Sequence, residues 1–268
     1  MDYPVYFQKF DTCFKTTINC GLRERTADFN AVQSVAVQDE YNLREIPFEE
    51  GDVVIDIGAH IGSVSLLLAS LDTRLEIYAY EPLPENVDLL RKNAVMNGFT
   101  NIFPFLLAVG GEEGRKKIYY GDEATESGRC HHFFGNACGV PLKGFYEADV
   151  VTLAKIFLDN KIEKCKLVKL DTEGAELDIL QACPLKVLRR IDYIVGEHHN
   201  VKREAILKAT RGLFVDVPCP WQTEVELGHF WFRNRKHVEA DLDNNPLQAE
   251  PARSDNRLPA VPGRQDGG

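Results

Sequence analysis

The sequence predicts an α/β protein built on a mostly parallel sheet with helices on both faces. From residue 52 onward, continuous runs of Val, Ile and Leu alternate with amphipathic segments, the pattern of βαβ units whose strands are buried on both faces. The first run, VVIDIG at 53–58, ends on glycine and turns at once into a helical segment, as the opening strand of a doubly wound sheet does. A chain of 268 residues is long enough to bury one large core of this class.

The regular region divides into strands and helices joined by short polar connections. Seven strands of one sheet are predicted at 52–58, 75–82, 101–111, 164–171, 189–199, 213–217 and 229–233. Helices are predicted at about 60–71 and 201–211, and at 84–98, 151–160 and 174–182. The helix at 84–98 illustrates the pattern, because Leu83, Val87, Leu90 and Ala94 form one apolar stripe. An extra strand is predicted at 115–120.

Three segments lack this regularity. Residues 1–50 are weakly periodic and are interpreted as an N-terminal capping segment before a main domain at 51–236. Within that domain, 121–147 holds five glycines and no lasting period. It is far longer than the usual α/β connection of about 2 to 6 residues, so we interpret it as a substrate-facing loop. Residues 237–268 are rich in Pro, Asp, Arg and Gly and are predicted to be a disordered tail.

Composition narrows the class of protein. The net charge of −10 disfavours a surface that neutralises phosphates, so we expect no nucleic-acid partner. Seven scattered cysteines without a CxxC pair argue against a secreted disulfide framework and favour the cytoplasm. No basic and apolar leader opens the chain, and no run of about 18 apolar residues occurs, so we expect no membrane span.

The turn after the first strand is the main candidate for ligand binding. In open parallel sheets, ligands bind beyond the carboxyl ends of the strands. Gly58 allows a sharp turn and a close ligand approach, and Gly62 allows close helix packing. Glu81 ends the second strand, where a carboxylate accepts hydrogen bonds from both hydroxyls of an adenosine ribose. The turn therefore predicts a nucleoside-containing ligand.

The acidic residues favour one such ligand. Asp56 precedes Gly58 by two residues and brings a negative charge to the turn, where a dinucleotide would need room for its pyrophosphate. S-adenosylmethionine carries a sulfonium and an ammonium group and no phosphate, so it suits this turn. A nicotinamide-dependent oxidoreductase is the alternative, because it shares the glycine turn and the acid at Glu81. A non-catalytic binding module of the same fold is the third hypothesis. Structural alternatives are a helix-capping role for Asp56 and a surface position for Glu81.

Six stretches together resemble the FkbM family of S-adenosylmethionine-dependent methyltransferases. They are VVIDIGAHIG, YAYEPLPENVDLLRKNAVMNG, FLLAVGGEEG, VTLAKIF, KLVKLDTEGAELDIL and IVGEHH, in family order across about 52–200. The resemblance implies a class I methyltransferase fold, a Rossmann-like seven-stranded sheet whose last strand is antiparallel. It also implies S-adenosylmethionine as cofactor and O-methylation of a small-molecule acceptor, a sugar or a polyketide-like natural product.

The same resemblance assigns cofactor-binding residues. Those that would line the methionine end are Asp56, Gly58, Ala59, His60 and Gly62. Glu81, followed by Pro82, would hold the ribose, and Ala108 would lie near the adenine. His60 stands where the family more often has Asn. Leu106 and Leu107 stand where the family often has a polar residue, so backbone atoms alone are expected to hold the adenine edge.

Methyl transfer to a hydroxyl also needs a base beyond the fourth or fifth strand. The stretch DTEGAE places Asp171 and Glu173 after the fourth strand, and GEHH places Glu197, His198 and His199 at the end of the fifth. Glu197 and His199 share a face, opposite His198. We predict His199 as the base, with His198 and Asp171 as alternatives. A helix N-cap is the structural alternative for Asp171.

Metal binding is left open by the sequence. Asp171, Glu173 and Glu197 supply oxygen ligands for a divalent ion, but no spacing typical of a metal site is present, so an ion is not favoured. The CHH at 130–132 with Cys138 lacks the paired ligands of a zinc site, and we interpret this stretch as part of a substrate-facing lid.

Overall fold

A seven-stranded sheet organises the protein. The computed structural model describes residues 4–71, 74–121, 131–132, 142–218 and 227–238. Residues 1–235 belong to one compact unit. The strands of its main sheet are β3 (Val53–Ile57), β4 (Glu76–Glu81), β5 (Ile102–Leu106), β10 (Cys165–Leu170), β11 (Ile191–His199), β12 (Phe214–Asp216) and β13 (Leu227–Asn234).

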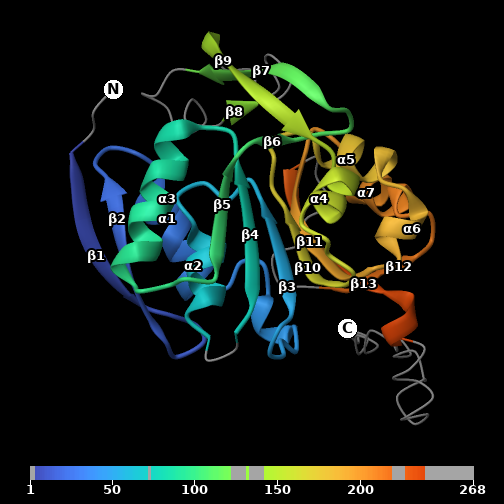
Figure 1. Cartoon of the computed structure of the whole chain (residues 1–268), viewed down its shortest axis with the longest axis horizontal. Helices are drawn as coiled ribbons and strands as arrows, with labels where there is room; N and C mark the ends of the chain where they lie inside the picture. The colour runs from blue at the N-terminus through green and yellow to red at the C-terminus, as the bar shows by residue number, and fades with distance from the viewer. Residues whose placement is uncertain (1–3, 72–73, 122–130, 133–141, 219–226, 239–268) are drawn as a thin grey trace, which may run out of the picture. The chain divides into compact units, whose positions relative to one another are not determined.

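The strand order is β12-β13-β11-β10-β3-β4-β5 (Figure 1). Neighbours from β11 to β5 run parallel, whereas β13 is antiparallel to both β11 and β12. From β3 the chain adds β4 and β5 on one side and later adds β10 and β11 on the other. The order therefore reverses between β3 and β10, where a doubly wound sheet opens a crevice. The predicted seven-stranded sheet with an antiparallel last strand is confirmed.

Helices cover both faces of this sheet (Figure 1). They are α1 (Asp28–Val32), α2 (Ser63–Ala69), α3 (Pro84–Met96), α4 (Leu153–Asp159), α5 (Glu176–Ala182), α6 (Leu185–Leu188) and α7 (Arg203–Ala209). The first three lie on one face and the last four on the other. The five predicted helices are confirmed, although α2 begins only after Gly62. The short α6 was not predicted.

Two cores follow from the alternation of side chains along the strands. Val54 and Leu167 pack with α2 and α3 in one core, whereas Ile55 and Val168, their chain neighbours, pack with α4 and α5 in the other. Successive residues of a strand point to opposite faces, so a strand covered on both faces is apolar throughout. This is why these strands read as continuous hydrophobic runs.

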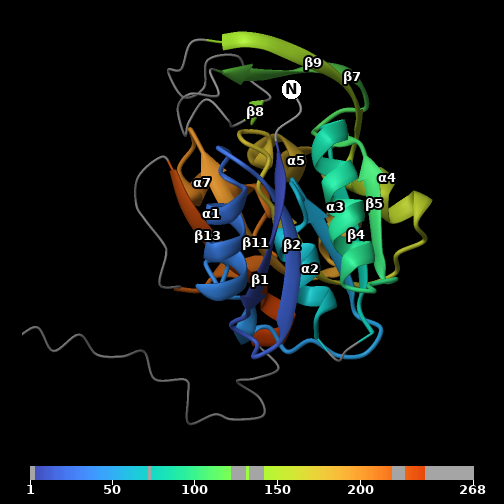
Figure 2. The ribbon, with the colours of Figure 1, turned by 90° about the vertical axis from the view of Figure 1, so that its left-hand side faces the viewer.

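The N-terminal segment adds a hairpin to the first core. Strands β1 (Val5–Asp11) and β2 (Thr17–Arg23) pair antiparallel and stand beside α1, α2 and α3 (Figure 2). Ile18, Cys20 and Leu22 of β2 are buried in the core that α2 and α3 also form. A π-helix, η1 (Gln33–Val37), and a 3-10 helix, η2 (Leu43–Glu45), complete this segment. Its weak periodicity did not reveal any of these elements.

A second, four-stranded sheet has the order β6-β9-β7-β8. Its strands are β6 (Ala108–Val109), β7 (Gly114–Gly121), β8 (His131–His132) and β9 (Leu142–Val151). The strand predicted at 115–120 is confirmed as β7. The expectation of a loop throughout 121–147 was wrong for Gly121, which ends β7, and for 131–132 and 142–147, which pair with β7 as β8 and as part of β9.

Some predictions fall outside the described residues. They include 122–130 and 133–141, with Cys130 and Cys138 of the stretch considered for zinc, and 239–268 of the predicted tail. Among the helices in the described part of the chain, none is long and apolar enough to cross a membrane.

Candidate active site

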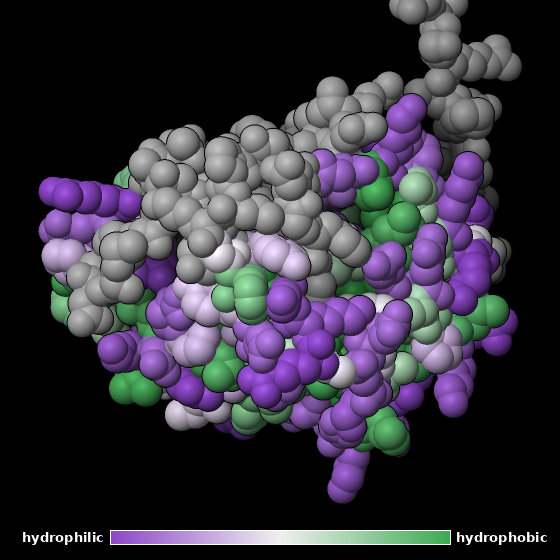
Figure 3. Space-filling view, turned by 90° about the horizontal axis from the view of Figure 1, so that it is seen from above, coloured by the Kyte–Doolittle hydropathy of each residue, from purple (hydrophilic) through white to green (hydrophobic). Residues whose placement is uncertain are grey.

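A cavity of about 460 Å³ opens at the carboxyl edge of the main sheet. Its walls come from the turns after β3 and β4, the ends of β10 and β11, and the N-terminal segment. Ile118 of β7 and Tyr146 of β9 also line it, so the second sheet contributes to its wall. The described residues visible from above are mainly hydrophilic, with scattered apolar side chains between them (Figure 3).

The glycine turn is fixed by its own backbone bonds. Gly58 has φ of 76°, and the amides of Gly58 and Ala59 both donate to the carbonyl of Tyr80. A Cβ on Gly58 would lie 1.7 Å from the carbonyl oxygen of Asp171, so no other residue fits between β3 and β10 here. Gly62, also of positive φ, precedes α2 and lies against Leu90 of α3. The predicted close helix packing at Gly62 is confirmed.

Glu81 ties the ends of β3 and β4 together. Its Oε2 accepts a hydrogen bond from the amide of His60 at 2.9 Å, and its Oε1 accepts from the amide of Leu83 and from Asn86 Nδ2, both at 3.1 Å. Burial raises the pKa of Glu81, and these three bonds partly oppose the shift. A carboxylate has about four acceptor positions. Oε2, with one bond accepted, therefore retains a lone pair on a residue that lines the cavity.

Asp56 lies beneath the turn and does not line the cavity. It is fully buried, its Oδ2 accepts a hydrogen bond from Ser65 Oγ at 2.7 Å, and its Oδ1 lies 3.5 Å from Lys169 Nζ. Lys169 also donates to the carbonyl oxygen of Gly58 and lies 3.5 Å from Asp171. Burial lowers the pKa of Lys169, but Asp171 and Asp56 raise it more. The expectation that Asp56 presents its charge in the turn needs correction, because Lys169 offsets that charge.

His60 faces the N-terminal segment. Its Nε2 lies 3.3 Å from Arg23 Nη2 and 3.5 Å from Asp28 Oδ1. Burial lowers the pKa of His60 to about 4, although Asp28 acts in the opposite direction. His60 is therefore neutral near pH 7. It lines the cavity, as do Arg23 and Asp28, which the sequence did not single out.

The loop between β10 and α5 is organised by a buried glutamate. Glu176 Oε1 accepts hydrogen bonds from the amide and hydroxyl of Thr172, both at 2.9 Å, and from the amide of Gly174 at 3.1 Å. Ala175 precedes α5 as its N-cap, so the alternative of Asp171 as a capping residue is not observed. Asp171 instead lines the cavity and accepts a hydrogen bond from Tyr41 OH at 2.9 Å. Burial raises the pKa of Asp171, and Lys169 opposes this.

The three residues at the end of β11 alternate between faces, as the sequence predicts. Glu197 lines the cavity. His198 is fully buried, and its Nδ1 lies 2.8 Å from the carbonyl oxygen of Val201. His199 is also buried, but it faces the carboxylates of the site: its Nε2 lies 3.4 Å from Glu197 and 3.3 Å from Glu173.

His199 is held as a cation. Its Nδ1 lies 3.1 Å from Glu176 Oε1. Burial lowers the pKa of His199, but the bonds to Glu176 and Glu197 outweigh burial and raise it to about 12. Near pH 7 this imidazole donates protons in hydrogen bonds and has no free acceptor nitrogen. Neither His198 nor His199 lines the cavity, so the structure does not bring either predicted base to its wall.

Several residues of the site had no signal in the sequence. Glu40 and Tyr41 come from the weakly periodic N-terminal segment, yet both line the cavity. His229 of β13 lies 3.2 Å from Glu197 Oε1. Burial, followed by repulsion from Glu197, raises the pKa of Glu40 to about 7. Lys169 did carry a signal, because it is, with Lys166, a charged residue inside the strand predicted at 164–171.

The opposite end of the cavity is more apolar. Pro82, Leu107, Ala108, Val109 and Ile118 line it. Ala108 follows β5 in β6 and pairs with Val150 of β9. The structure therefore places Pro82 and Ala108 at the cavity, together with Gly58, Ala59, His60, Glu81, Asp171 and Glu197. Four predicted site residues do not line it: Asp56, Gly62, His198 and His199.

The strand order, the antiparallel β13 and a cavity at the point where the order reverses define a class I methyltransferase fold. Residues 56–235 match the model of the methyltransferase FkbM domain, and the chain belongs to this methyltransferase family.

Two curated relatives are the hexuronic acid methyltransferase AglP of Haloferax volcanii and the 31-O-demethyl-FK506 methyltransferase FkbM of Streptomyces tacrolimicus. AglP is 24% identical over 162 residues, which cover 60% of this chain and 62% of AglP. FkbM is 27% identical over 188 residues, which cover 60% of this chain and 70% of FkbM.

Solved structures with some likeness include TrmN from Thermus thermophilus and SMU.1697c, a putative methyltransferase from Streptococcus mutans in complex with SAH. The match to TrmN has a TM-score of 0.45 at 14% identity and covers 81% of this chain and 55% of the TrmN chain. The match to SMU.1697c has a TM-score of 0.42 at 11% identity and covers 74% of this chain and 96% of the SMU.1697c chain.

Proposed function

We propose that the protein transfers a methyl group from S-adenosylmethionine to a hydroxyl of a small molecule, a sugar or a natural product. One observation carries the choice of cofactor. The turn amides that would receive a pyrophosphate are already used, because Gly58 and Ala59 donate to Tyr80 and His60 donates to Glu81. A nicotinamide dinucleotide would have to displace these bonds. An adenosine bound through its ribose needs only the remaining lone pair of Glu81.

The residues present fit this cofactor. Glu81 would accept a ribose hydroxyl, Gly58 and His60 would face the methionine part, and the apolar end around Ala108 would receive the adenine. Asp56 and Gly62 would support the turn from beneath, without touching the ligand. When bound, S-adenosylmethionine supplies a methyl group activated by its sulfonium charge.

Asp171 fits the role of base better than either histidine. It lines the cavity, its raised pKa brings it closer to that of an acid-base catalyst, and Tyr41 and Lys169 hold its carboxylate in place. It would take the proton of the acceptor hydroxyl while the new O–C bond forms and the C–S bond breaks. His199 would position Glu197, because it is protonated and bonded on both nitrogens.

Two relatives support the proposed acceptor class. AglP is named a hexuronic acid methyltransferase, and FkbM a 31-O-demethyl-FK506 methyltransferase. Transfer to a small-molecule oxygen extends this to the present chain. We also place the protein in the cytoplasm without a nucleic-acid partner, on the scattered cysteines and the net charge of −10.

Calorimetric titration with S-adenosylmethionine and S-adenosylhomocysteine tests the cofactor. Wild-type protein is expected to bind both, and Glu81→Gln to bind about 10- to 150-fold more weakly, because a hydrogen bond to a charged group contributes about 1.5 to 3 kcal/mol. Glu76→Gln, at the exposed start of the same strand, is the matched control and should bind as the wild type does.

Two results would contradict the proposal. One is a wild-type protein that binds neither ligand. The other is saturable binding of reduced nicotinamide cofactor, followed by fluorescence. Mass spectrometry of hydroxylated metabolites after incubation then tests the acceptor: the product should carry one additional methyl group on oxygen.

A further inference from the structure

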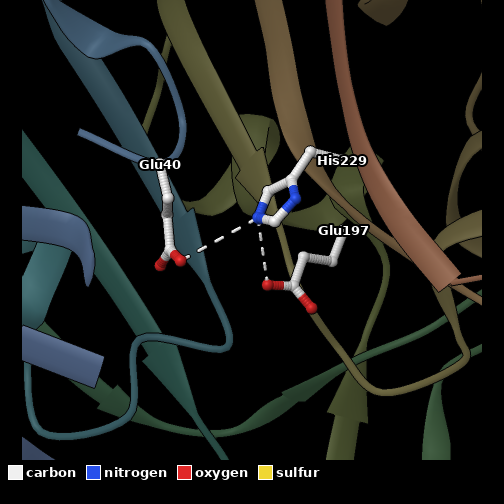
Figure 4. A group of neighbouring side chains, drawn as sticks. All are labelled: Glu40, Glu197 and His229. Atoms are coloured by element: carbon white, nitrogen blue, oxygen red, sulfur yellow. Dashed lines mark ion pairs between the residues drawn. The ribbon is translucent and has the colours of Figure 1, made fainter. Parts of the chain in front are cut away.

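Glu40, Glu197 and His229 converge from three separate segments, and we call them the cation triad (Figure 4). Glu40 lies between η1 and η2, Glu197 near the end of β11, and His229 opposite Glu197 on the antiparallel β13. Glu40 and Glu197 line the cavity. The imidazole Nε2 of His229 points towards both carboxylates (Figure 4).

The spacing of the triad atoms fits ligands that share one cation. His229 Nε2 lies 3.2 Å from Glu197 Oε1 and 4.0 Å from Glu40 Oε2. One ligand atom of each residue lies within 4.8 Å of the others. An octahedral cation with ligands at about 2.1 Å places neighbouring ligand atoms about 3 Å apart and opposite ones about 4 Å apart. Two carboxylates suit Mn²⁺ or Mg²⁺, and the imidazole favours the transition metal Mn²⁺ over Mg²⁺, which takes oxygen ligands.

Two further observations point to a ligand at this position. His229 Nε2 is inaccessible to solvent and makes no hydrogen bond of acceptable geometry within the described residues, although it lies close to Glu197. The second oxygen of Glu197 is held by His199, which Glu176 holds in turn. Such a chain of outer contacts is how proteins orient a carboxylate that binds a metal.

The charge around the triad is also unbalanced. Carboxylates that line this end of the cavity are Glu40, Asp171, Glu173 and Glu197. Lys169 faces Asp171 but also pairs with Asp56. The protonated His199 faces Glu173 and Glu197 but also pairs with Glu176, so these two cations offset the group only in part. A divalent cation would therefore relieve repulsion that Glu40 and Glu197 otherwise exert on each other.

We propose that Glu40, Glu197 and His229 bind one divalent cation, Mn²⁺, which would hold the oxygen of the methyl acceptor. The role of the cation in methyl transfer rests on the proposed function, whereas the test of Mn²⁺ binding does not. Three protein ligands leave coordination positions open towards the cavity. There the cation would lower the pKa of the acceptor hydroxyl. Its proton passes to Asp171, the oxygen bonds to the methyl carbon, and the C–S bond breaks to leave a neutral thioether.

A second group, Asp171, Glu173 and His199, is close enough for a metal but fits less well. Both nitrogens of His199 already face carboxylates, with Glu176 at Nδ1 and Glu173 and Glu197 at Nε2. A cation there would have to displace a proton that three neighbouring carboxylates stabilise. Glu173 therefore provides the control that separates the two groups.

Mn²⁺ binding by electron paramagnetic resonance tests the proposal on the full-length protein after treatment with a chelator. We expect one Mn²⁺ per chain, and at least about tenfold weaker binding in Glu40→Gln and in His229→Gln. Glu173→Gln should bind within about threefold of the wild type. Circular dichroism and thermal unfolding of each variant show whether it is folded. If His229→Gln is not folded, the Mn²⁺ affinity of Glu40→Gln decides the test, because glutamine has nearly the same shape as glutamate.

Several outcomes would overturn the cation triad. They are the absence of saturable Mn²⁺ binding in the wild type, unchanged affinity in folded Glu40→Gln, or a loss confined to Glu173→Gln, which would move the ion to the other group. Titration with S-adenosylhomocysteine on the same samples separates the two proposals. Cofactor binding without Mn²⁺ binding refutes only the triad, and Mn²⁺ binding without cofactor binding refutes only the proposed function.

Discussion

Individual residues of this site take their roles from their surroundings rather than from their type. His60 and His199 show this most clearly. Burial near Arg23 keeps His60 neutral, with a pKa of about 4, whereas Glu176 and Glu197 keep His199 protonated, with a pKa of about 12. Two imidazoles in one site therefore differ in charge at every pH between these values. Carboxylates differ similarly, since Glu197 has a lowered pKa and Asp171 a raised one.

Replacement of the proposed base tests the site at this scale. Asp171→Asn should lower kcat by about 100- to 10,000-fold, the usual contribution of a general base, with affinity for S-adenosylhomocysteine nearly unchanged. Steady-state kinetics and calorimetry measure the two effects separately. Asp178→Asn, in α5 and away from the cavity, is the control. A normal kcat in Asp171→Asn together with a large loss of kcat in His199→Gln would show that His199, and not Asp171, is the base.

Between elements, α3 connects the N-terminal hairpin to the glycine turn. Asn93, fully buried, accepts a hydrogen bond from the amide of Gly21 at 2.7 Å and donates to the carbonyl of Ile61 at 3.1 Å. One turn later, Asn97 bonds both backbone groups of Asn19 at an exposed position. Asn93 and Asn97 thus both hold β2 against α3, but only Asn93 also bonds the turn that follows β3.

This pair of asparagines gives a matched test. Asn93→Ala leaves two buried backbone groups without partners, so it should lower the free energy of unfolding by about 2 to 6 kcal/mol, about 1 to 3 kcal/mol for each group that loses its bond. Asn97→Ala should cost about 1 kcal/mol or less, because water replaces the lost bonds. Urea unfolding followed by circular dichroism measures both. An equal loss of unfolding free energy in the two variants would show that burial does not determine how much each asparagine stabilises the protein.

At the scale of the whole molecule, buried thiols in both cores link stability to pH. Cys20 lies in one core, and Cys165 and Cys183 in the other. Burial raises the pKa of Cys20 and of Cys183 to about 12, and that of Cys165 also rises. The folded protein therefore retains protons that the unfolded chain loses above about pH 9. The contribution of each thiol is complete below pH 9 and is lost as the pH rises towards 12.

Alkaline unfolding measures this effect. The free energy of unfolding should fall between pH 9 and pH 11 by up to about 1.4 kcal/mol per pH unit for each buried thiol. Cys183→Ala should be less stable throughout, because it leaves a cavity, but its stability should fall less steeply with pH. Urea titrations at several pH values give the slopes. An identical slope in wild type and Cys183→Ala would exclude this thiol as a contributor.

The fold could be predicted from the sequence to a large extent. The run at 53–58 carries the apolar signal of a strand buried on both faces, and Gly58 marks the turn between this strand and its helix. The hairpin β1–β2 was not predicted, because alternation over seven residues at a partly exposed edge is weak. The strand at 142–147 was hidden among glycines and became regular only through pairing with β7.

The candidate site was predicted less completely. Gly58, Glu81, Asp171 and Glu197 are adjacent to strand ends, and strand ends can be located from periodicity. Glu40 and His229 could not be placed, because they lie far apart in the chain and meet only when β13 pairs with β11.

By itself, the sequence determined the alternation of strands and helices and the glycine turn, because both are encoded in local spacing. Its motifs also resemble the FkbM methyltransferase family, whose model residues 56–235 match. Only the tertiary structure decided which carboxylates meet, which histidine is charged, and that Lys169 offsets Asp56. Charge interactions depend on distance through space and on burial, and neither quantity exists until distant segments have packed together.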